Sequence, residues 1–144
     1  MRILLSIGLV QAALCTMAQA QTVNGCSRAT ATDLSGQSST TITFPNGNFT
    51  YSPRCIKVDL GAQVTFNGSF SGHPMSGGTV VGGVATPASS GPFLPMTNTG
   101  TSKSFTMSSN GDFPYYCLAH GAAFNLSGMV YVGPEDGIFR NDFE

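Results

Sequence analysis

Apolar and polar residues alternate in several short stretches of the chain, and glycine, proline and asparagine separate these stretches. The clearest alternation covers residues 55–60, and similar ones surround Val64 and follow in residues 103–108. A period of two is typical of a β-strand that has one face buried and the other in solvent. The residues expected to face the interior are Ile56, Val58, Leu60, Val64, Phe66, Phe105 and Met107.

Further short strands are expected at residues 41–44, 79–85, 113–117 and 129–132. Turn-forming residues bound them, and Asn110-Gly111 is a strong turn signal before the third of these strands. Residues 21–41 and 67–102 show little regular pattern. Several short strands at intervals set by turns predict an antiparallel β-sandwich or barrel.

Residues 1–20 have the pattern of an export signal. Arg2 supplies a positive charge, residues 3–17 are mostly apolar, and residues 18–20 (AQA) have the small-x-small pattern of a cleavage site. We expect cleavage after Ala20 and export of the mature chain to the periplasm or the cell exterior. The alternative is a membrane anchor, although the apolar stretch is shorter than the ~20 residues that cross a bilayer.

Residues 133–144 differ from the rest of the chain. Their sequence, GPEDGIFRNDFE, holds four acidic residues and one arginine. We expect a solvated tail; the alternative is a short sorting or anchoring signal, because Ile138, Phe139 and Phe143 are unusually apolar for a tail. Residues 21–132, between the export signal and the tail, have the length of one domain.

Composition narrows the possible functions. Charged residues make up 9% of the chain, against ~25% in average soluble domains, and the formal net charge is −1. This balance excludes the basic surface that nucleic-acid-binding proteins need. The chain has two histidines and four cysteines. Removal of the signal takes away Cys15 and leaves an odd number of cysteines, so one thiol is expected to have a role outside a disulfide.

The candidate chemistry lies at Cys117, His120 and His73. Cys117 and His120 form a C-x-x-H motif at the end of an expected strand, and His73 lies in a loop after the strand that contains Val64. One cysteine and two histidines are the in-plane ligands of a trigonal blue copper site. The alternative is a buried thiol and two surface histidines without a metal.

Three segments resemble the cupredoxins, the plastocyanin- and azurin-like blue copper proteins. Residues 49–67 resemble their early strands, with a proline, an alternating Ile-x-Val and a glycine turn before the first histidine. Residues 111–120 (GDFPYYCLAH) resemble the Gly-x-Phe-x-Tyr-x-Cys-x-x-His of plastocyanins. Residues 126–132 (LSGMVYV) are similar to the Met-x-Gly-x-Val-x-Val of their last strand.

The resemblance implies an all-β, cupredoxin-like Greek-key β-sandwich or barrel of about seven to eight short strands. It also implies one type 1 copper ion, held by His73, Cys117 and His120. Proteins of this family pass single electrons between redox partners, so we expect an electron carrier and not an enzyme. The alternatives are a copper-binding protein for delivery or sequestration, and a metal-free binding module.

The sequence departs from the family at two positions near the copper ligands. The family usually has an axial methionine, and alignment of the last strand places Leu126 there, which cannot coordinate. Asn125 is the second candidate for the axial position and Met129 the third, because Met129 is out of phase with the inward-facing residues. The residue after the first histidine typically donates an N–H to the cysteine sulfur, but Pro74 has none. From both departures we expect a high reduction potential.

With Cys117 assigned to the metal, Cys26 and Cys55 are expected to form a disulfide, which fits an exported protein. The alternative is metal binding by all three cysteines. Phe49, Phe66 and Phe113 are most simply core residues. By analogy with the family, small and apolar residues beside the histidines are expected to dock transient redox partners of a monomeric protein. These residues are Pro74, Met75, Gly121, Ala122 and Phe124.

Overall fold

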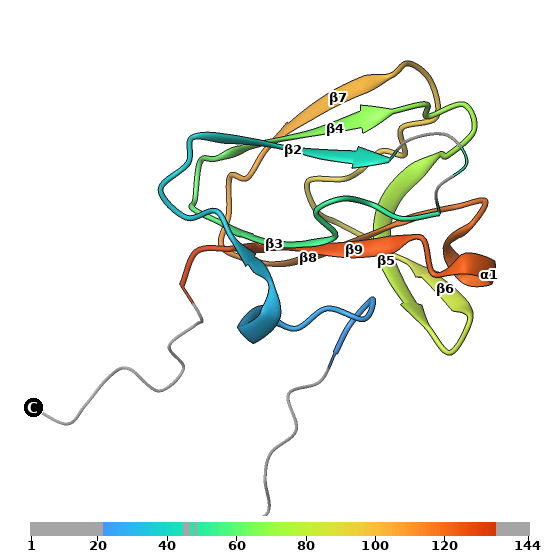
Figure 1. Ribbon diagram of the computed structural model, residues 1–144, viewed down its shortest axis with the longest axis horizontal. Helices are drawn as coiled ribbons and strands as arrows, with labels where there is room; N and C mark the ends of the chain where they lie inside the picture. Colours follow the sequence, from blue (N-terminus) through green and yellow to red (C-terminus); the bar gives the residue numbers. More distant parts are fainter. Residues whose placement is uncertain (1–21, 45–46, 48, 135–144) are drawn as a thin grey trace, which may run out of the picture.

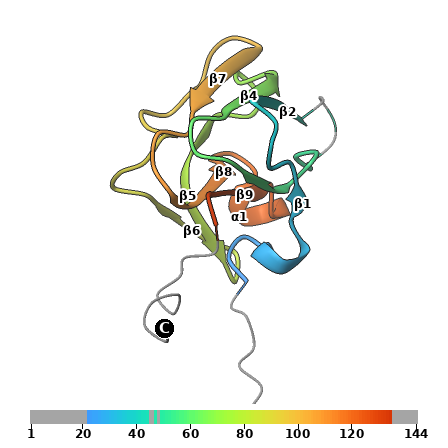
Figure 2. The ribbon, with the colours of Figure 1, turned by 90° about the vertical axis from the view of Figure 1, so that its left-hand side faces the viewer.

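The computed structural model describes residues 22–44, 47 and 49–134, which form two facing β-sheets (Figures 1 and 2). The larger sheet has six strands in the order β1 (Thr32–Asp33), β3 (Cys55–Val58), β9 (Ser127–Val132), β8 (Gly111–Cys117), β5 (Met75–Val81) and β6 (Val84–Pro87). The smaller sheet has the order β2 (Ser39–Phe44), β4 (Gln63–Gly68) and β7 (Ser102–Thr106). Two short helical turns complete the described elements, η1 (Arg28–Thr30) and α1 (Gly121–Phe124). The predicted all-β sandwich is therefore confirmed, with nine strands in place of seven or eight.

The expectation of a purely antiparallel arrangement is wrong. Three strand pairs run parallel: β1 with β3, β3 with β9, and β2 with β4. After β2 the chain passes to the other sheet, forms β3, and returns to form β4 beside β2. When the chain leaves a sheet between two neighbouring strands, these two strands can be parallel. A two-residue hairpin can only join antiparallel strands.

The strand expected at residues 79–85 is also different in the structure. Gly82 and Gly83 have positive φ angles of 57° and 78°, and they form a two-residue turn between β5 and β6. Val81 pairs with Val84 across this turn. Two consecutive positive φ angles are typical of the turn that matches strand twist in a hairpin, and glycine adopts them without a steric cost. One expected strand is therefore two.

The main core lies between the two sheets, and most residues predicted to face inward are buried there. They are Ile56, Val58, Val64, Phe66, Phe105 and Met107. Leu60 is the exception, because it is 55% exposed. Strand β3 ends at Val58, so Leu60 lies in the following turn, where the alternation of faces no longer applies.

The N-terminal segment covers the outer face of the larger sheet. The expected disulfide between Cys26 and Cys55 is present and joins this segment to β3. Cys26 and Ala31 pack there against Met129 and Tyr131 of β9. The expected export signal and most of the acidic tail lie outside the described residues. Among the described residues, we find no helix with the length and apolar character needed to cross a membrane.

Candidate metal centre

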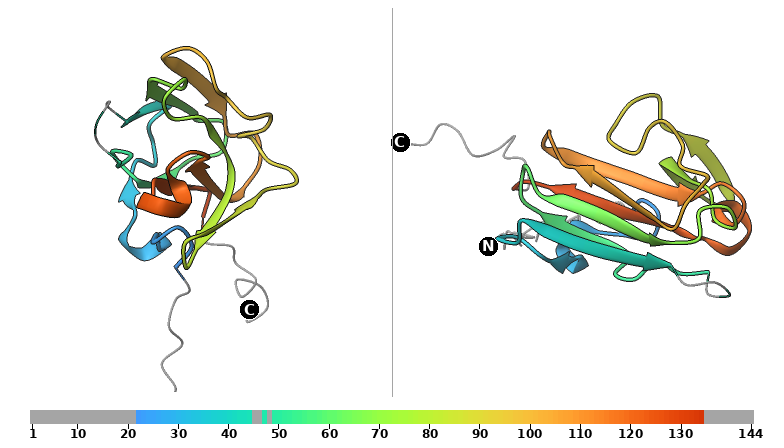
Figure 3. Two further views of the ribbon diagram at one scale, coloured as in Figure 1. Left: turned by 90° about the vertical axis from the view of Figure 1, so that its right-hand side faces the viewer. Right: turned by 90° about the horizontal axis from the view of Figure 1, so that it is seen from above.

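The three residues singled out in the sequence lie at one end of the sandwich, which Figure 3 (left) shows from outside with α1 in front. His73 lies in the loop before β5, Cys117 is the last residue of β8, and His120 precedes α1. Strands β5 and β8 are antiparallel neighbours in which Met75 is opposite Cys117. The start of one strand and the end of the other therefore meet, which brings the two loops together.

The three side chains point their donor atoms at one another. Cys117 Sγ lies 3.8 Å from His73 Nδ1 and 3.5 Å from His120 Nδ1, and the two Nδ1 atoms are 3.1 Å apart. A point equidistant from three atoms so arranged lies about 2.0 Å from each, close to the ~2.0–2.3 Å bonds of imidazole nitrogen and thiolate sulfur to zinc. One thiolate and two imidazoles in this triangle fit a copper ion.

Burial shifts the pKa values of two of the three side chains, those of His73 and Cys117. His73 is 6% exposed. Its pKa is lowered, first by desolvation and then by the neighbouring His120. Burial raises the pKa of the Cys117 thiol, while the backbone N–H groups of His120 and Ala119 act in the opposite direction. At neutral pH the His73 imidazole is therefore neutral and the Cys117 thiol is protonated. A metal ion that binds the sulfur as a thiolate would displace this proton.

The three candidates for the axial position have different surroundings. Leu126 is fully buried in the same cluster as Cys117, and its carbonyl oxygen accepts a hydrogen bond of 2.9 Å from the Cys117 N–H. Asn125 has a left-handed backbone, and its Oδ1 accepts a hydrogen bond of 2.9 Å from Ser127 Oγ. Met129 lies on the outer face of the larger sheet with Cys26. The apolar side chain of Leu126 therefore lies in the core, close to Cys117 at the end of β8.

Phe49, expected as a core residue, is 38% exposed and lies at the site. Its ring centroid is 4.7 Å from that of His120, and its ring stacks on Phe124 with centroids 4.3 Å apart. On the inner side, the Phe44 ring lies edge-on to His73 at 6.1 Å. Aromatic rings therefore surround both imidazoles. The sequence does not reveal the position of Phe49, because the residues around it show no alternation of apolar and polar positions from which the orientation of its side chain could be inferred.

The residues expected to dock a partner are only partly at the surface. Ala122 and Phe124 are exposed and Pro74 is half-buried. Met75 and Gly121 are buried, so their expected exposure is wrong. Met75 begins β5 and points into the core opposite Cys117, whereas Gly121 packs so closely under Tyr116 that an added Cβ would lie 2.9 Å from the ring.

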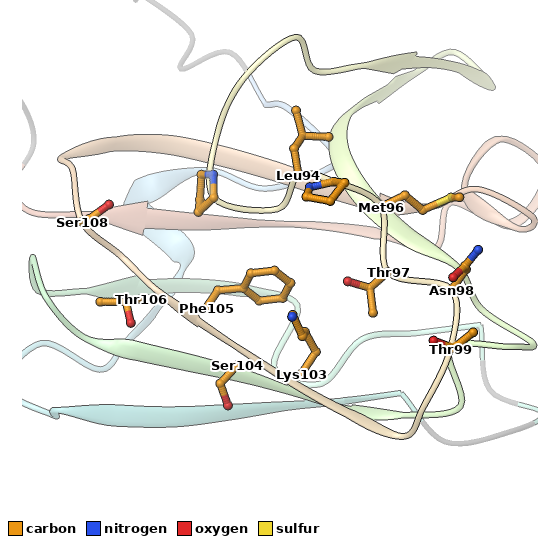
Figure 4. Close-up of a pocket in the computed structure, with 12 residues that line it drawn as sticks. Leu94, Met96, Thr97, Asn98, Thr99, Lys103, Ser104, Phe105, Thr106 and Ser108 are labelled. Atoms are coloured by element: carbon orange, nitrogen blue, oxygen red, sulfur yellow. The ribbon is translucent and has the colours of Figure 1, made fainter.

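A separate groove of about 530 Å³ runs between the segment 92–99 and β7 (Figure 4). Leu94, Met96 and Phe105 contribute apolar surface to it, and Lys103 is its charged lining residue. None of the three metal-ligand candidates lines this groove. The groove is therefore separate from the cluster formed by His73, Cys117 and His120.

No family model matches the sequence, and a search of curated proteins finds no similar sequence. The chain is similar to several solved structures. A purple cupredoxin from Nitrosopumilus maritimus is 25% identical over 65% of this chain and 98% of its own, with a TM-score of 0.45. A mutant plastocyanin of a fern is 22% identical over 65% of this chain and 100% of its own, with a TM-score of 0.45. Pseudoazurin from Methylobacterium extorquens is 16% identical over 67% of this chain and 76% of its own, with a TM-score of 0.48.

Proposed function

We propose that the protein is an exported electron carrier that binds one type 1 copper ion through His73, Cys117 and His120. The observation that supports this most is the convergence of one sulfur and two imidazole nitrogens on a single point at one end of the sandwich, where His73 and Cys117 are buried. Copper bound by such ligands accepts and releases one electron at a time. We assign no enzymatic activity to the site.

The side chains around the ligands have complementary roles in this function. His73 is buried against Phe44, and this packing holds its ring in place and excludes water. His120 is partly exposed beneath the stacked rings of Phe49 and Phe124, so its outer edge is the proposed route for the electron. Transient redox partners would dock on the exposed apolar residues around it, Phe49, Ala122 and Phe124.

Two residues near the ligands affect the reduction potential in opposite directions. Leu126 offers no donor atom, which favours the cuprous state and raises the midpoint. Pro74 acts in the direction opposite to the one expected from the sequence, for an electrostatic reason. An N–H dipole that points at the sulfur stabilises the thiolate charge and reduces its donation to copper, so the absence of this N–H at Pro74 lowers the midpoint.

Export to an oxidising compartment is part of the proposal. The disulfide between Cys26 and Cys55 persists in the periplasm or outside the cell, whereas the cytosol keeps most thiols reduced. The predicted export signal at residues 1–20 is consistent with this location. Mass spectrometry of the exported protein would test the predicted cleavage after Ala20.

The decisive experiment adds cupric ion to the mature protein and records visible and paramagnetic-resonance spectra. We expect an intense charge-transfer band from the Cys117 thiolate that bleaches reversibly on reduction. Cys117→Ala should lose the band, while the double variant Cys26→Ser/Cys55→Ser should keep it. A colourless complex with cuprous ion alone would indicate delivery or sequestration instead. Absence of copper uptake would reject the metal site.

A further inference from the structure

The hydroxyl group of Tyr51 has no partner in the core. Tyr51 is 1% exposed, and within the described part of the chain its hydroxyl is the buried side-chain polar atom without a hydrogen bond. An unpartnered buried hydroxyl costs free energy that a phenylalanine in the same place would avoid. A tyrosine at this position therefore calls for a physical explanation.

Tyr51 lies on the side of the core that faces the metal centre. Its ring packs edge-on against Tyr115 with centroids 4.9 Å apart, and against Phe44 with centroids 5.3 Å apart. Phe44 in turn contacts the ring of His73. Tyr115 is two residues before Cys117 in β8, so both side chains point to the same face of the sheet. Tyr51 is thus next to the face from which the Cys117 sulfur projects.

Few polar groups are available to the Tyr51 hydroxyl in this cluster. The buried cluster contains two hydroxyls and one thiol, those of Tyr51, Tyr115 and Cys117, among otherwise apolar side chains. The Tyr115 hydroxyl already donates a 2.8 Å hydrogen bond to the carbonyl oxygen of Arg54. Burial raises the pKa of Tyr51, and a charged Cys117 would add to this effect, so the hydroxyl stays protonated and keeps its dipole. Among the side chains of this cluster, the Cys117 sulfur is the remaining polar atom toward which the Tyr51 O–H dipole can turn, and no hydrogen bond joins the two groups in the structure.

We propose that Tyr51 tunes the metal centre: its hydroxyl, free of other partners, turns the O–H dipole toward the Cys117 sulfur and stabilises the thiolate. Buried hydroxyl dipoles orient in the local field, and polar groups around the cysteine sulfur set the potential of a blue copper site. This inference rests on the proposed copper-binding function. Tyr51 then supplies, from the core side, part of the stabilisation that the missing N–H of Pro74 cannot give.

The test compares two identical substitutions on neighbouring tyrosines, Tyr51→Phe and Tyr115→Phe. Without metal, Tyr51→Phe should unfold in denaturant at the same concentration as the wild type or a higher one, because the removed hydroxyl has no partner. Tyr115→Phe should unfold at a lower concentration, since it loses the bond to Arg54. With copper, Tyr51→Phe should shift the charge-transfer band to lower energy. It should also reduce the ratio of cuprous to cupric affinity by about threefold to tenfold. Tyr115→Phe should leave both unchanged.

Each other outcome overturns the inference. If Tyr51→Phe leaves the band and the affinity ratio unchanged while the wild type is blue, Tyr51 has no tuning role but the copper site stands. If metal-free Tyr51→Phe is destabilised as much as Tyr115→Phe, the hydroxyl has a structural partner and is not free to turn. If wild-type protein shows no charge-transfer band, the proposed function fails, and the inference fails with it.

Discussion

In the proposed copper site, Leu126 is the candidate for the axial position, and its side chain has no donor atom. It is fully buried in the cluster that contains Cys117, and the two residues are joined by a backbone hydrogen bond. Met129, three residues later, is equally well buried but belongs to the cluster on the opposite face of the sheet. Met129 is therefore close in sequence to the candidate metal centre, but its side chain lies on the opposite face of the sheet.

Replacing Leu126 by methionine should lower the reduction potential of the copper-loaded protein. A thioether at this position gives the cupric state a weak donor that leucine lacks. Because leucine and methionine have similar volumes, the free energy of unfolding should change by less than about 1.5 kcal/mol. Voltammetry and denaturant unfolding measure the two effects. Met129→Leu is the matched control and should leave the potential unchanged; an equal shift in both variants would contradict the assignment of Leu126.

Individual residues differ in how far the sequence reveals them. Cys117 and His120 are recognisable from a local spacing, and His73 because it is the remaining histidine. Phe49 is not recognisable, since its position beside His120 depends on a loop whose path no periodicity encodes. The Tyr51 hydroxyl is similar: the sequence shows a tyrosine, but only three-dimensional packing reveals that its hydroxyl has no partner.

Among the elements, the N-terminal segment has a larger role than its irregular sequence indicates. Asn24 is buried, and its Nδ2 donates to the carbonyl oxygens of Gly78, Tyr115 and Gly128, which belong to three different strands. Its Oδ1 accepts a 2.6 Å hydrogen bond from the Val80 N–H. One side chain thus satisfies backbone groups at the place where β5 leaves β8 to pair with β6.

Asn24→Ala should reduce the free energy of unfolding by about 3 kcal/mol, because buried backbone groups of three strands lose their partner. Denaturant unfolding of the metal-free protein measures this loss. Asn98→Ala, at an exposed loop position, is the control and should change stability by less than about 0.5 kcal/mol. Similar small losses in both variants would mean that the strands hold together without Asn24.

The elements themselves could be predicted better than their partners. Alternation placed β3, β4 and β7 correctly, because burial of one strand face is a local property of the sequence. It could not show that β2 and β4 are parallel, since this depends on the intervening passage of the chain through the other sheet. The β5–β6 hairpin differs from the single strand expected at residues 79–85, because apolar residues lie on both sides of the Gly82-Gly83 turn and resemble one continuous strand.

At the scale of the whole molecule, charge and candidate chemistry are separated. The segments that form the candidate metal centre, residues 69–75 and 118–126, contain no Asp, Glu, Lys or Arg. The ion pairs Arg28–Asp112 and Lys57–Asp33 involve the other end of the larger sheet, where β8 begins and β9 ends. The end with the metal centre instead exposes Phe124, Phe49 and Ala122. Arg54, which donates to the Ser127 carbonyl oxygen, is a charged residue near this end, and it is only partly exposed. A contact centred on Phe124, Phe49 and Ala122 therefore buries mainly apolar surface.

Electron exchange between oxidised and reduced copies of the copper-loaded protein should therefore depend little on salt. Two copies that meet through these apolar side chains bring few charges together, so salt screening has little effect and the rate should change by less than about threefold between ~10 mM and ~0.5 M salt. Line broadening in NMR spectra of mixed copies measures this rate. Ala122→Lys places a positive charge on the exposed surface of α1 in both copies, and it should slow exchange at low salt and make the rate rise as salt is added. A wild-type rate that depends strongly on salt, together with no effect of Ala122→Lys, would mean that electrons leave through a different and charged face.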